Sequence, residues 1–489
     1  MKKFNIPHSV SHATEILEKA GFKAFLVGGS LRDLVMERKP KDWDITTNAT
    51  PLEIINLFSK TFYNNKYGTV TVVDEEVKDE TLKTIEITPF RLESRYTDGR
   101  HPDTVTFTEH IEDDLKRRDF TINAIAYNIS QGQIIDPFQG QSDIKAKIIR
   151  AVGDPSNRFE EDALRMMRAV RLATELDFTI DTATKTAIND NKSFLRNVSR
   201  ERIRDEFSKM ILSDTPKSGV ELLEELSILE IIVPELREGM GIEQNQAHSF
   251  DVWQHNLKTL QHAANKKWEF HVRLAALFHD VAKPKTRLWR DEKNDWTFYG
   301  HDVVGAKMTK NALVRLKYPQ DLVELVSKLV RYHLFFSDVD KITMSAVRRL
   351  IKNMGREHIW DLMKVRACDR IGTGRPKEAP YRLRKYESMI EEALMDPISV
   401  GMLKIDGNTI MRITNIKPGP KIGYILHALL EEVLDSPTAN TKDYLENRAI
   451  EMSKLSEKEL TQIGQAGKGK KDQIIGEKVE TIRKKHWVK

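Results

Sequence analysis

The pattern of apolar and polar residues changes twice along the chain. In residues 1–152, short alternating or β-branched runs stand between turns, and they predict strands at Phe25-Leu26-Val27, 70–73, 83–88 and 104–107. The turn at Gly153-Asp154-Pro155 then separates this part from a long region with another period. From about Arg158, apolar residues such as Leu164 and Met167 recur every three or four positions, which predicts helices.

These changes predict an α+β protein with four parts. We expect a head with a small β-sheet at residues 1–152, followed by a helical neck at 153–238. Histidines become frequent in a third part at 239–375, which we call the histidine-rich domain. A helical tail occupies 376–489, and the basic stretch after residue 465 is expected to be partly disordered.

Composition narrows the class of protein. The chain has 489 residues, of which 40% are hydrophobic and 31% charged, with a formal net charge of +5. No run of 18 apolar residues predicts a membrane span, and the N-terminus lacks the apolar stretch of a signal peptide. The single cysteine, Cys368, excludes an intrachain disulfide and fits the cytoplasm. We therefore expect a globular protein without a membrane partner, with a mildly basic balance that permits an anionic one.

Two glycines follow the first predicted strand. Gly28 and Gly29 allow backbone N–H groups to approach an anion closely, and the helix expected after them begins with Ser30 as its cap. Arg32 adds a guanidinium that can hold a phosphate through two hydrogen bonds. The turn therefore predicts a phosphate-binding site.

Two aspartates follow this turn at a spacing of two. On a strand, Asp42 and Asp44 would point to the same face and hold the same pair of hard cations. Such ions activate an attacking hydroxyl and stabilise a leaving pyrophosphate. Glu86, in a later strand, is a candidate third carboxylate. Two such aspartates alone are usually surface charge, but the ordered set of glycine turn, arginine and aspartates is much more specific.

These residues resemble the nucleotidyltransferase signature of the DNA polymerase β superfamily, and specifically the class II CCA-adding enzymes and poly(A) polymerases. Four further stretches match that family in order. They are Arg117-Arg118-Asp119-Phe120-Thr121-Ile122-Asn123-Ala124-Ile125-Ala126, Ile135-Asp136-Pro137-Phe138 with Gly140, Glu161-Asp162-Ala163-Leu164-Arg165 with Arg168 and Arg171, and Arg200-Glu201-Arg202-Ile203 running on to Glu206-Phe207. The resemblance implies a polymerase-β-like head that binds Mg²⁺ and transfers CMP and AMP from CTP and ATP to tRNA.

The resemblance also implies a role for each matching residue. Asp42, Asp44 and Glu86 would be catalytic, and the two aspartates would bind Mg²⁺. The nucleotide would be bound by Gly28, Gly29, Arg32, Arg118, Asn123, Asp162, Arg165, Arg168 and Arg171.

The spacing of the fourth stretch supports this interpretation. Asp162, Arg165, Arg168 and Arg171 follow one another at intervals of three, which on one helix places them on one face. An aspartate offers acceptors and an arginine offers a fixed fork of donors, so the pair could contact the Watson–Crick edge of C or A. The alternative for these residues alone is a surface salt bridge.

The stretch at 93–102 resembles a loop that lets family members change from CTP to ATP. Its presence argues against an enzyme that adds only CC. It leaves open the choice between CCA addition and addition of A alone.

The histidine-rich domain carries a second constellation. The adjacent His279-Asp280 ends an apolar helical run, and a buried pair of this kind is costly unless it is partnered or bound to metal. The stretch resembles the HD-domain phosphohydrolases: His255, His279, Asp280 and Asp369 match their basic signature, and His301 and His333 match the extra ligands of dinuclear members. A divalent metal and hydrolysis of cyclic phosphates or phosphomonoesters are implied. The alternative is a degenerate HD fold that serves as a tRNA-binding scaffold.

The tail resembles the C-terminal segment of bacterial CCA-adding enzymes that carry an HD domain. Pro418-Gly419-Pro420 and Gly423 precede an amphipathic helix expected at 425–434. This turn could offer N–H groups to phosphates or could simply join two helices. Lysines of the tail would contact the tRNA backbone.

The resulting hypothesis is template-independent addition of CCA to tRNA by a monomer or homodimer. Three alternatives remain. The first is an A-adding enzyme or poly(A) polymerase, the second is mainly a phosphohydrolase with an inactive head, and the third is a non-catalytic RNA-binding protein.

Overall fold

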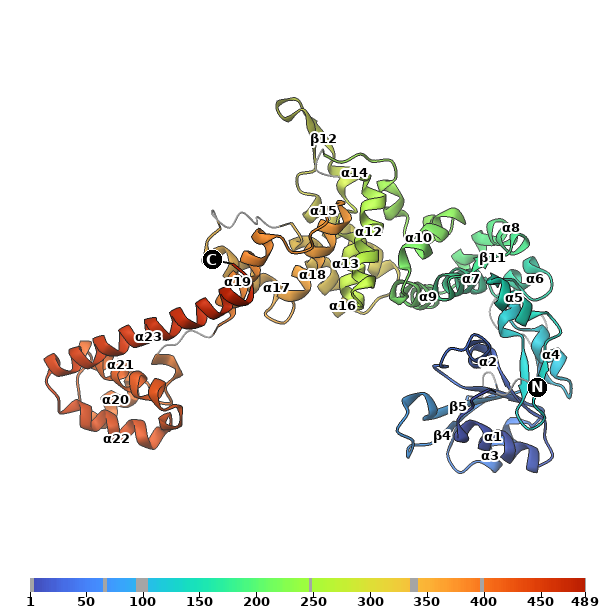
Figure 1. Ribbon diagram of the computed structural model, residues 1–489, viewed down its shortest axis with the longest axis horizontal. Helices are drawn as coiled ribbons and strands as arrows, with labels where there is room; N and C mark the ends of the chain where they lie inside the picture. The colour runs from blue at the N-terminus through green and yellow to red at the C-terminus, as the bar shows by residue number, and fades with distance from the viewer. Residues whose placement is uncertain are drawn as a thin grey trace. The chain divides into compact units, whose positions relative to one another are not determined.

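The computed structural model describes residues 4–64, 68–93, 104–245, 249–334, 342–395 and 400–488 (Figure 1). The chain forms two compact units. The first comprises residues 1–333 and 364–376, and the second comprises residues 334–363 and 377–489.

The head is built on a seven-stranded mixed sheet with the strand order β3-β4-β5-β2-β1-β8-β9. Its strands are β1 (Ala24–Val27), β2 (Asp44–Thr47), β3 (Thr61–Asn64), β4 (Thr69–Val73), β5 (Thr84–Pro89), β8 (Ala126–Asn128) and β9 (Gln133–Ile135). β2 pairs antiparallel with β1 and parallel with β5, so that Asp44 lies opposite Val27 on one side and Glu86 on the other. The four strands expected from the sequence are present, the last of them as β7 of a separate ribbon.

Helices cover this sheet because each has an apolar stripe to bury. The remaining elements of the head are α1 (His8–Lys19), α2 (Gly28–Val35), α3 (Pro51–Leu57), η1 (Glu80–Leu82), β6 (Arg91–Glu93), β7 (Val105–Phe107), α4 (Ile111–Lys116), η2 (Thr121–Asn123) and α5 (Gly140–Ala146). α1 contacts β1, and α3 contacts β4 and β5 (Figure 1). Phe25, Phe90 and Leu115 belong to the apolar core of the head.

Ser30 is not the helix cap that the sequence suggested. α2 already begins at Gly28, and the buried Ser30 hydroxyl donates a hydrogen bond to the Val27 carbonyl at 2.8 Å. Gly28 adopts φ +71°, a conformation that glycine enters without steric cost, so the chain turns into the helix two residues earlier than expected.

The neck is helical, as expected. Its elements are β10 (Ile148–Ile149), α6 (Pro155–Glu161), α7 (Leu164–Leu176), β11 (Thr179–Ile180), α8 (Thr182–Asn191), η3 (Lys192–Asn197), α9 (Arg200–Leu212), α10 (Pro216–Glu225), α11 (Leu229–Ile232) and η4 (Pro234–Gly239). Asp162 lies in extended backbone between α6 and α7, with φ −147°. The expectation that it shares one helix face with Arg165 was therefore wrong. Its Oδ1 accepts the N–H of Leu164 at 3.1 Å, a local turn that starts α7.

The histidine-rich domain packs α12, α13, α15, α16 and α18 around buried histidines. Its elements are α12 (Val252–Asn265), α13 (Phe270–Phe278), α14 (Lys283–Thr286), β12 (Leu288–Arg290), η5 (Asp291–Lys293), β13 (Asp295–Thr297), α15 (His301–Arg315), α16 (Gln320–Tyr332) and α18 (Ile359–Gly372). Cys368 is buried beside Ala263 and Ala276 and is a small residue of this core.

The second unit is helical and has its own apolar core. Its elements are α17 (Met344–Met354), α19 (Tyr381–Leu394), η6 (Val400–Met402), α20 (Gly407–Thr414), α21 (Pro420–Asp435), η7 (Pro437–Ala439), α22 (Lys442–Ser453) and α23 (Glu457–Lys485). Pro418 and Gly419 join α20 to α21, whereas Gly423 lies inside α21. The segment after residue 465 was expected to be partly disordered, but it belongs to the helix α23. This helix begins at a capping box between Ser456 and Glu459.

Candidate active site

Asp42 and Asp44 both face the turn formed by Gly28 and Gly29. A Cβ atom built on Gly28 would lie 2.9 Å from Oδ2 of Asp44, and one built on Gly29 would lie 3.9 Å from Oδ1 of Asp42. β2 begins at Asp44, so Asp42 lies just before the strand rather than on it, with the buried Trp43 between them. The side chains nevertheless reach the same turn, and Glu86 lies beside Asp44 in the neighbouring strand. The glycines leave the space that this arrangement needs.

The charge around Asp44 fits a divalent cation. Burial and the nearby Asp42 carboxylate raise the pKa of Asp44 to about 7, with Glu86 adding to the repulsion and Arg118 opposing it. Carboxylate oxygens are the ligands that Mg²⁺ prefers, and a cation between them would remove the repulsion. Asp42 and Asp44 thus bring two carboxylates to the turn, and Glu86 lies near enough to raise the pKa of Asp44 further.

Two arginines border the turn. Arg118 Nη1 lies 3.3 Å from the position of a Cβ on Gly28, while its Nη2 donates to the buried Asp114 at 3.0 Å. Arg32 donates to Asp33 through Nε at 2.9 Å and through Nη2 at 2.7 Å. Both guanidinium groups are thus held in place at the turn, where a triphosphate would need positive charge.

A chain of polar contacts leads from Arg32 to α7. Arg32 Nη1 donates to Asn123 Oδ1 at 2.9 Å, and Asn123 Nδ2 donates to Asp119 Oδ1 at 3.2 Å. Asp119 Oδ2 accepts from Arg168 Nε at 2.8 Å. Burial alone would raise the pKa of Asp119, but the Arg168 guanidinium outweighs it and holds that pKa well below its usual range. We call Arg32, Asn123, Asp119 and Arg168 the polar chain. Asp119 lies in one of the stretches that resemble the family, but its sequence position alone indicated no role for it.

The residues expected to select the nucleotide have other partners than each other. Asp162 accepts two hydrogen bonds from Arg202 of α9, at 3.2 and 2.7 Å. Arg165 is buried and donates to Glu161 at 2.6 Å and to the Arg117 carbonyl at 3.1 Å. The structure therefore does not pair Asp162 with Arg165. Instead it holds each of them by a separate contact.

Arg171 lies further along α7 and joins it to α9. Its Nε donates to the buried Glu206 at 2.5 Å, and its Nη1 donates to Glu175 at 2.7 Å. Arg168, as described, faces Asp119. The two arginines thus connect α7 to the head and to α9.

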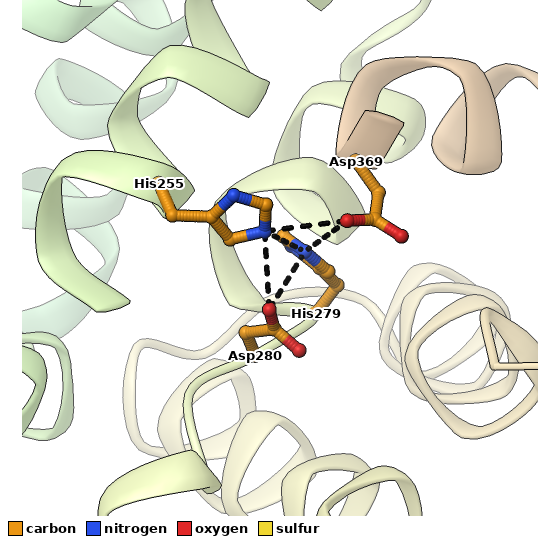
Figure 2. A group of neighbouring side chains, drawn as sticks. All are labelled: His255, His279, Asp280 and Asp369. Carbon is orange, nitrogen blue, oxygen red and sulfur yellow. Dashed lines mark hydrogen bonds and ion pairs between the residues drawn. The ribbon is translucent and has the colours of Figure 1, made fainter. Parts of the chain in front are cut away.

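The histidines and aspartates predicted as metal ligands in the histidine-rich domain lie close together in the structure. His255 from α12, His279 and Asp280 after α13, and Asp369 from α18 are all buried (Figure 2). His255 Nε2 lies 2.9 Å from His279 Nε2, 3.1 Å from Asp280 Oδ2 and 3.3 Å from Asp369 Oδ1. Bonds of about 2.1 Å to one metal ion place neighbouring ligand atoms roughly 3.0–3.4 Å apart, so these distances fit a metal site.

Two more histidines meet the other oxygen of Asp280. Oδ1 of Asp280 lies 3.3 Å from His301 Nε2 and 3.6 Å from His333 Nε2. The two carboxylate oxygens of Asp280 therefore face different groups of ligands. This arrangement suits two metal ions joined by one carboxylate. We call the six residues the histidine cluster: His255, His279, Asp280, His301, His333 and Asp369.

Backbone carbonyls orient three of the rings. Nδ1 of His279 lies 2.9 Å from the Ala276 carbonyl, and Nδ1 of His301 and of His333 each lie 2.6 Å from a carbonyl of the preceding turn. An N–H on Nδ1 leaves the lone pair on Nε2, which is the atom that points into the cluster. Burial lowers the pKa of His333, whereas for His279 the Asp280 and Asp369 carboxylates outweigh burial and raise the pKa to about 9.

The loop expected at 93–102 lies outside the described residues apart from Glu93, whose backbone ends β6. In the part of the chain that is described, no helix combines the length and apolar character needed to cross a bilayer.

Comparisons with known proteins match this architecture part by part. Family models match at residues 24–150 (poly A polymerase head domain), 177–240 (probable RNA and SrmB-binding site of polymerase A) and 252–371 (HD domain). A CCA-adding enzyme of Lactobacillus helveticus is 34% identical over 88% of this chain and 94% of that protein. One of Limosilactobacillus reuteri is 32% identical over 93% of this chain and all of that protein. The solved Bacillus stearothermophilus CCA-adding enzyme in complex with CTP is similar with a TM-score of 0.56 and 26% identity, over 91% of this chain and 98% of that one.

Proposed function

The chain belongs to the family of CCA-adding enzymes, and on that premise we propose that it adds C, C and A to the 3′ end of tRNA from CTP and ATP, without a nucleic-acid template. The observation that carries the proposal is the meeting of Asp42, Asp44 and Arg118 at the Gly28-Gly29 turn. Carboxylates and a guanidinium at a glycine turn are what metal-assisted transfer from a triphosphate requires.

Different residues of the head would bind the metal ions and the triphosphate. Asp42, Asp44 and Glu86 would hold Mg²⁺, which would supply positive charge for activating the tRNA 3′-hydroxyl and for stabilising the departing pyrophosphate. Gly28 and Gly29 give the triphosphate access to backbone N–H groups at the start of α2, while Arg32, Arg118 and Asn123 hold it in place. The hydroxyl then attacks the α-phosphate, and pyrophosphate leaves.

Selection of the base belongs to the segment around the start of α7. Asp162 supplies acceptors and Arg165 supplies donors for the Watson–Crick edge of C or A. Because Arg202 and Glu161 already hold these side chains, a base would exchange contacts within a preset arrangement rather than order free side chains. Arg168 and Arg171 complete the nucleotide-binding set by fixing α7.

The test uses tRNA transcripts that end before C, CC and CCA, incubated with CTP and ATP together, and then sequenced. We expect completion to CCA in each case. Incorporation of A alone would indicate an A-adding enzyme, and extension of unstructured RNA with ATP would indicate a poly(A) polymerase. Asp44→Asn should abolish addition, whereas His279→Ala should leave it intact; the opposite result would mean that the head is inactive.

The histidine cluster supports a second function, the hydrolysis of phosphate esters. The six buried residues form two groups that share the carboxylate of Asp280, and they would hold two divalent ions able to polarise a phosphate and activate water. Release of phosphate from glycerol 2-phosphate, and opening of 2′,3′-cyclic nucleotides, should require a divalent metal and vanish in His279→Ala. Asp44→Asn is the matched control and should hydrolyse both at the unaltered rate. No metal-dependent hydrolysis in the unaltered chain would favour a scaffold role.

A further inference from the structure

A hairpin is inserted between two ligands of the histidine cluster. Strands β12 and β13 and their turn lie between Asp280 and His301, and the hairpin extends away from α14 and α15 (Figure 1). A pocket of about 510 Å³ lies beside it, lined by residues 243–245, 249–251, 294–296 and Trp289. That volume is typical of sites for small ligands. The sequence analysis assigned no role to this segment.

Two tryptophans contribute apolar surface to the pocket. Trp289 and Trp296 are cross-strand partners, and their rings meet edge to face with centroids 5.2 Å apart. The Arg287 guanidinium covers the Trp296 ring at 3.7 Å, whereas Trp289 is 43% exposed. An exposed indole beside a pocket is a surface on which a planar ring can stack.

Two side chains in series, Gln244 and Lys283, link the lining of the pocket to the histidine cluster. Gln244 lines the pocket, and its Oε1 accepts a hydrogen bond from Lys283 Nζ at 2.5 Å. The same Nζ lies 2.6 Å from Oδ2 of Asp280, and Lys283 is buried. A ligand in the pocket would therefore extend toward the metal ligands past a fixed positive charge.

The polar lining of the pocket is unsuitable for a phosphate. Glu243, Asp251 and Asp295 line it. The Asp251 carboxylate accepts hydrogen bonds from the backbone N–H groups of Gly241 and Gln254, whereas Glu243 lies 3.6 Å from Arg287 and Asp295 keeps one oxygen on the N–H of Trp296. Carboxylates repel a phosphate but accept hydrogen bonds from the exocyclic amino groups of cytosine and adenine. The phosphate-binding chemistry lies instead at the histidine cluster and Lys283.

We propose that this pocket binds the amino-bearing base of a nucleotide, cytosine or adenine, whose phosphate group lies at the histidine cluster. Trp289 provides the stacking surface, and Glu243 and Asp295 provide acceptors for the amino group. The proposal deepens the hydrolytic function proposed for the cluster and rests on it for the position of the phosphate. The preferred substrate of that site is then a nucleotide or an RNA end, and a small phosphate ester is hydrolysed there without help from the pocket.

The test compares Trp289→Ala with Leu288→Ala in the full-length chain. Leu288 is the neighbouring hairpin residue, is 51% exposed and does not line the pocket, so it is a matched control. Binding of AMP, CMP and UMP is measured by calorimetry in the presence of Mn²⁺. Sites in the head contribute equally to both variants, so a difference between them reports on the hairpin. We expect Trp289→Ala to weaken AMP and CMP binding about 10-fold, because stacking contributes at this level.

Four outcomes decide the proposal. Equal affinities in Trp289→Ala and Leu288→Ala would overturn it, and UMP bound as tightly as CMP would overturn the role of the amino group. Hydrolysis of glycerol 2-phosphate, which carries no base, should be the same in both variants. If the unaltered chain hydrolyses no phosphate ester while Trp289→Ala still loses AMP affinity, the hydrolytic function fails and the base pocket stands.

Discussion

Asp119 is the residue on which the polar contacts between the head and α7 converge. It accepts hydrogen bonds from Asn123 and from Arg168, and it is buried. The sequence placed it inside a family stretch but gave no sign of its partners, because Arg168 lies 49 positions away. Side-chain pairing across such a distance depends on how the elements pack, which periodicity does not show.

Asp119→Asn should therefore destabilise the first unit by about 2–3 kcal/mol, since it removes one charge of a largely buried pair. Urea denaturation at pH 7 measures this. Asp177→Asn is the control: its carboxylate is 86% exposed, and it should change stability by less than about 0.5 kcal/mol.

The stability lost in Asp119→Asn should also depend on pH. The folded state holds the pKa of Asp119 below that of the unfolded chain, so its contribution is present above about pH 4 and declines as the pH falls below that value. The difference between Asp119→Asn and the unaltered chain should narrow between pH 4 and pH 3. A constant difference over that range would mean that the carboxylate acts through shape rather than charge.

At the scale of elements, the break between α6 and α7 decides where Asp162 lies. The three-residue spacing of Asp162 and the arginines after it predicted one helical face, yet Asp162 leaves the helix and turns toward Arg202 of α9. The sequence did contain a signal, because an aspartate two residues before a helix often accepts a backbone N–H there. Strands with buried alternating residues, such as Val70, Ile85 and Ile87, were predictable because period two has no competing explanation.

Asp162→Ala should relax the choice between C and A before it abolishes transfer. Loss of hydrogen bonds to a charged group corresponds to roughly a 10-fold change in relative kcat/KM for the two nucleotides. Single-nucleotide incorporation on tRNA ending before CC and before A measures both values. Asp190→Ala, at an exposed position of the same region, should leave the ratio unchanged.

Arg202→Lys tests the support of Asp162 from the other side. Lysine keeps the charge but cannot donate two hydrogen bonds in a planar fork, so the carboxylate would be less well fixed. We expect a smaller loss of nucleotide selectivity than in Asp162→Ala, with the same direction. A variant that lost transfer completely but kept full selectivity would show that Arg202 serves the chemistry instead.

At the scale of the whole molecule, the six residues of the histidine cluster all belong to the first unit, including Asp369, which follows an excursion of the chain through the second. These residues were predictable from the sequence because their order matches the signature of the HD-domain phosphohydrolases. The division into units was not visible, since it depends on where α17 and α18 pack. The hairpin of β12 and β13 was missed because each strand has only three residues.

Heating should accordingly reveal two transitions that respond differently to metal. In the Asp44→Asn chain, saturating Mn²⁺ should raise the transition of the first unit by several degrees, because an ion bound only to the folded state stabilises it by mass action. The second unit contains no residue of the cluster, and its transition should not move. Scanning calorimetry measures both, and His279→Ala should abolish the shift.

The polar chain from Arg32 to Arg168 has a consequence for how the enzyme would discriminate between nucleotides. One end lies where a triphosphate would sit, and the other lies one helical turn from Arg165. Any coupling of binding free energy between the two ends is, by thermodynamic reciprocity, equal in both directions. With such coupling, a nucleotide with the correct triphosphate but the wrong base would bind more weakly at both the base and the triphosphate. Selectivity between bases and affinity for the nucleotide would then depend on the same coupling free energy.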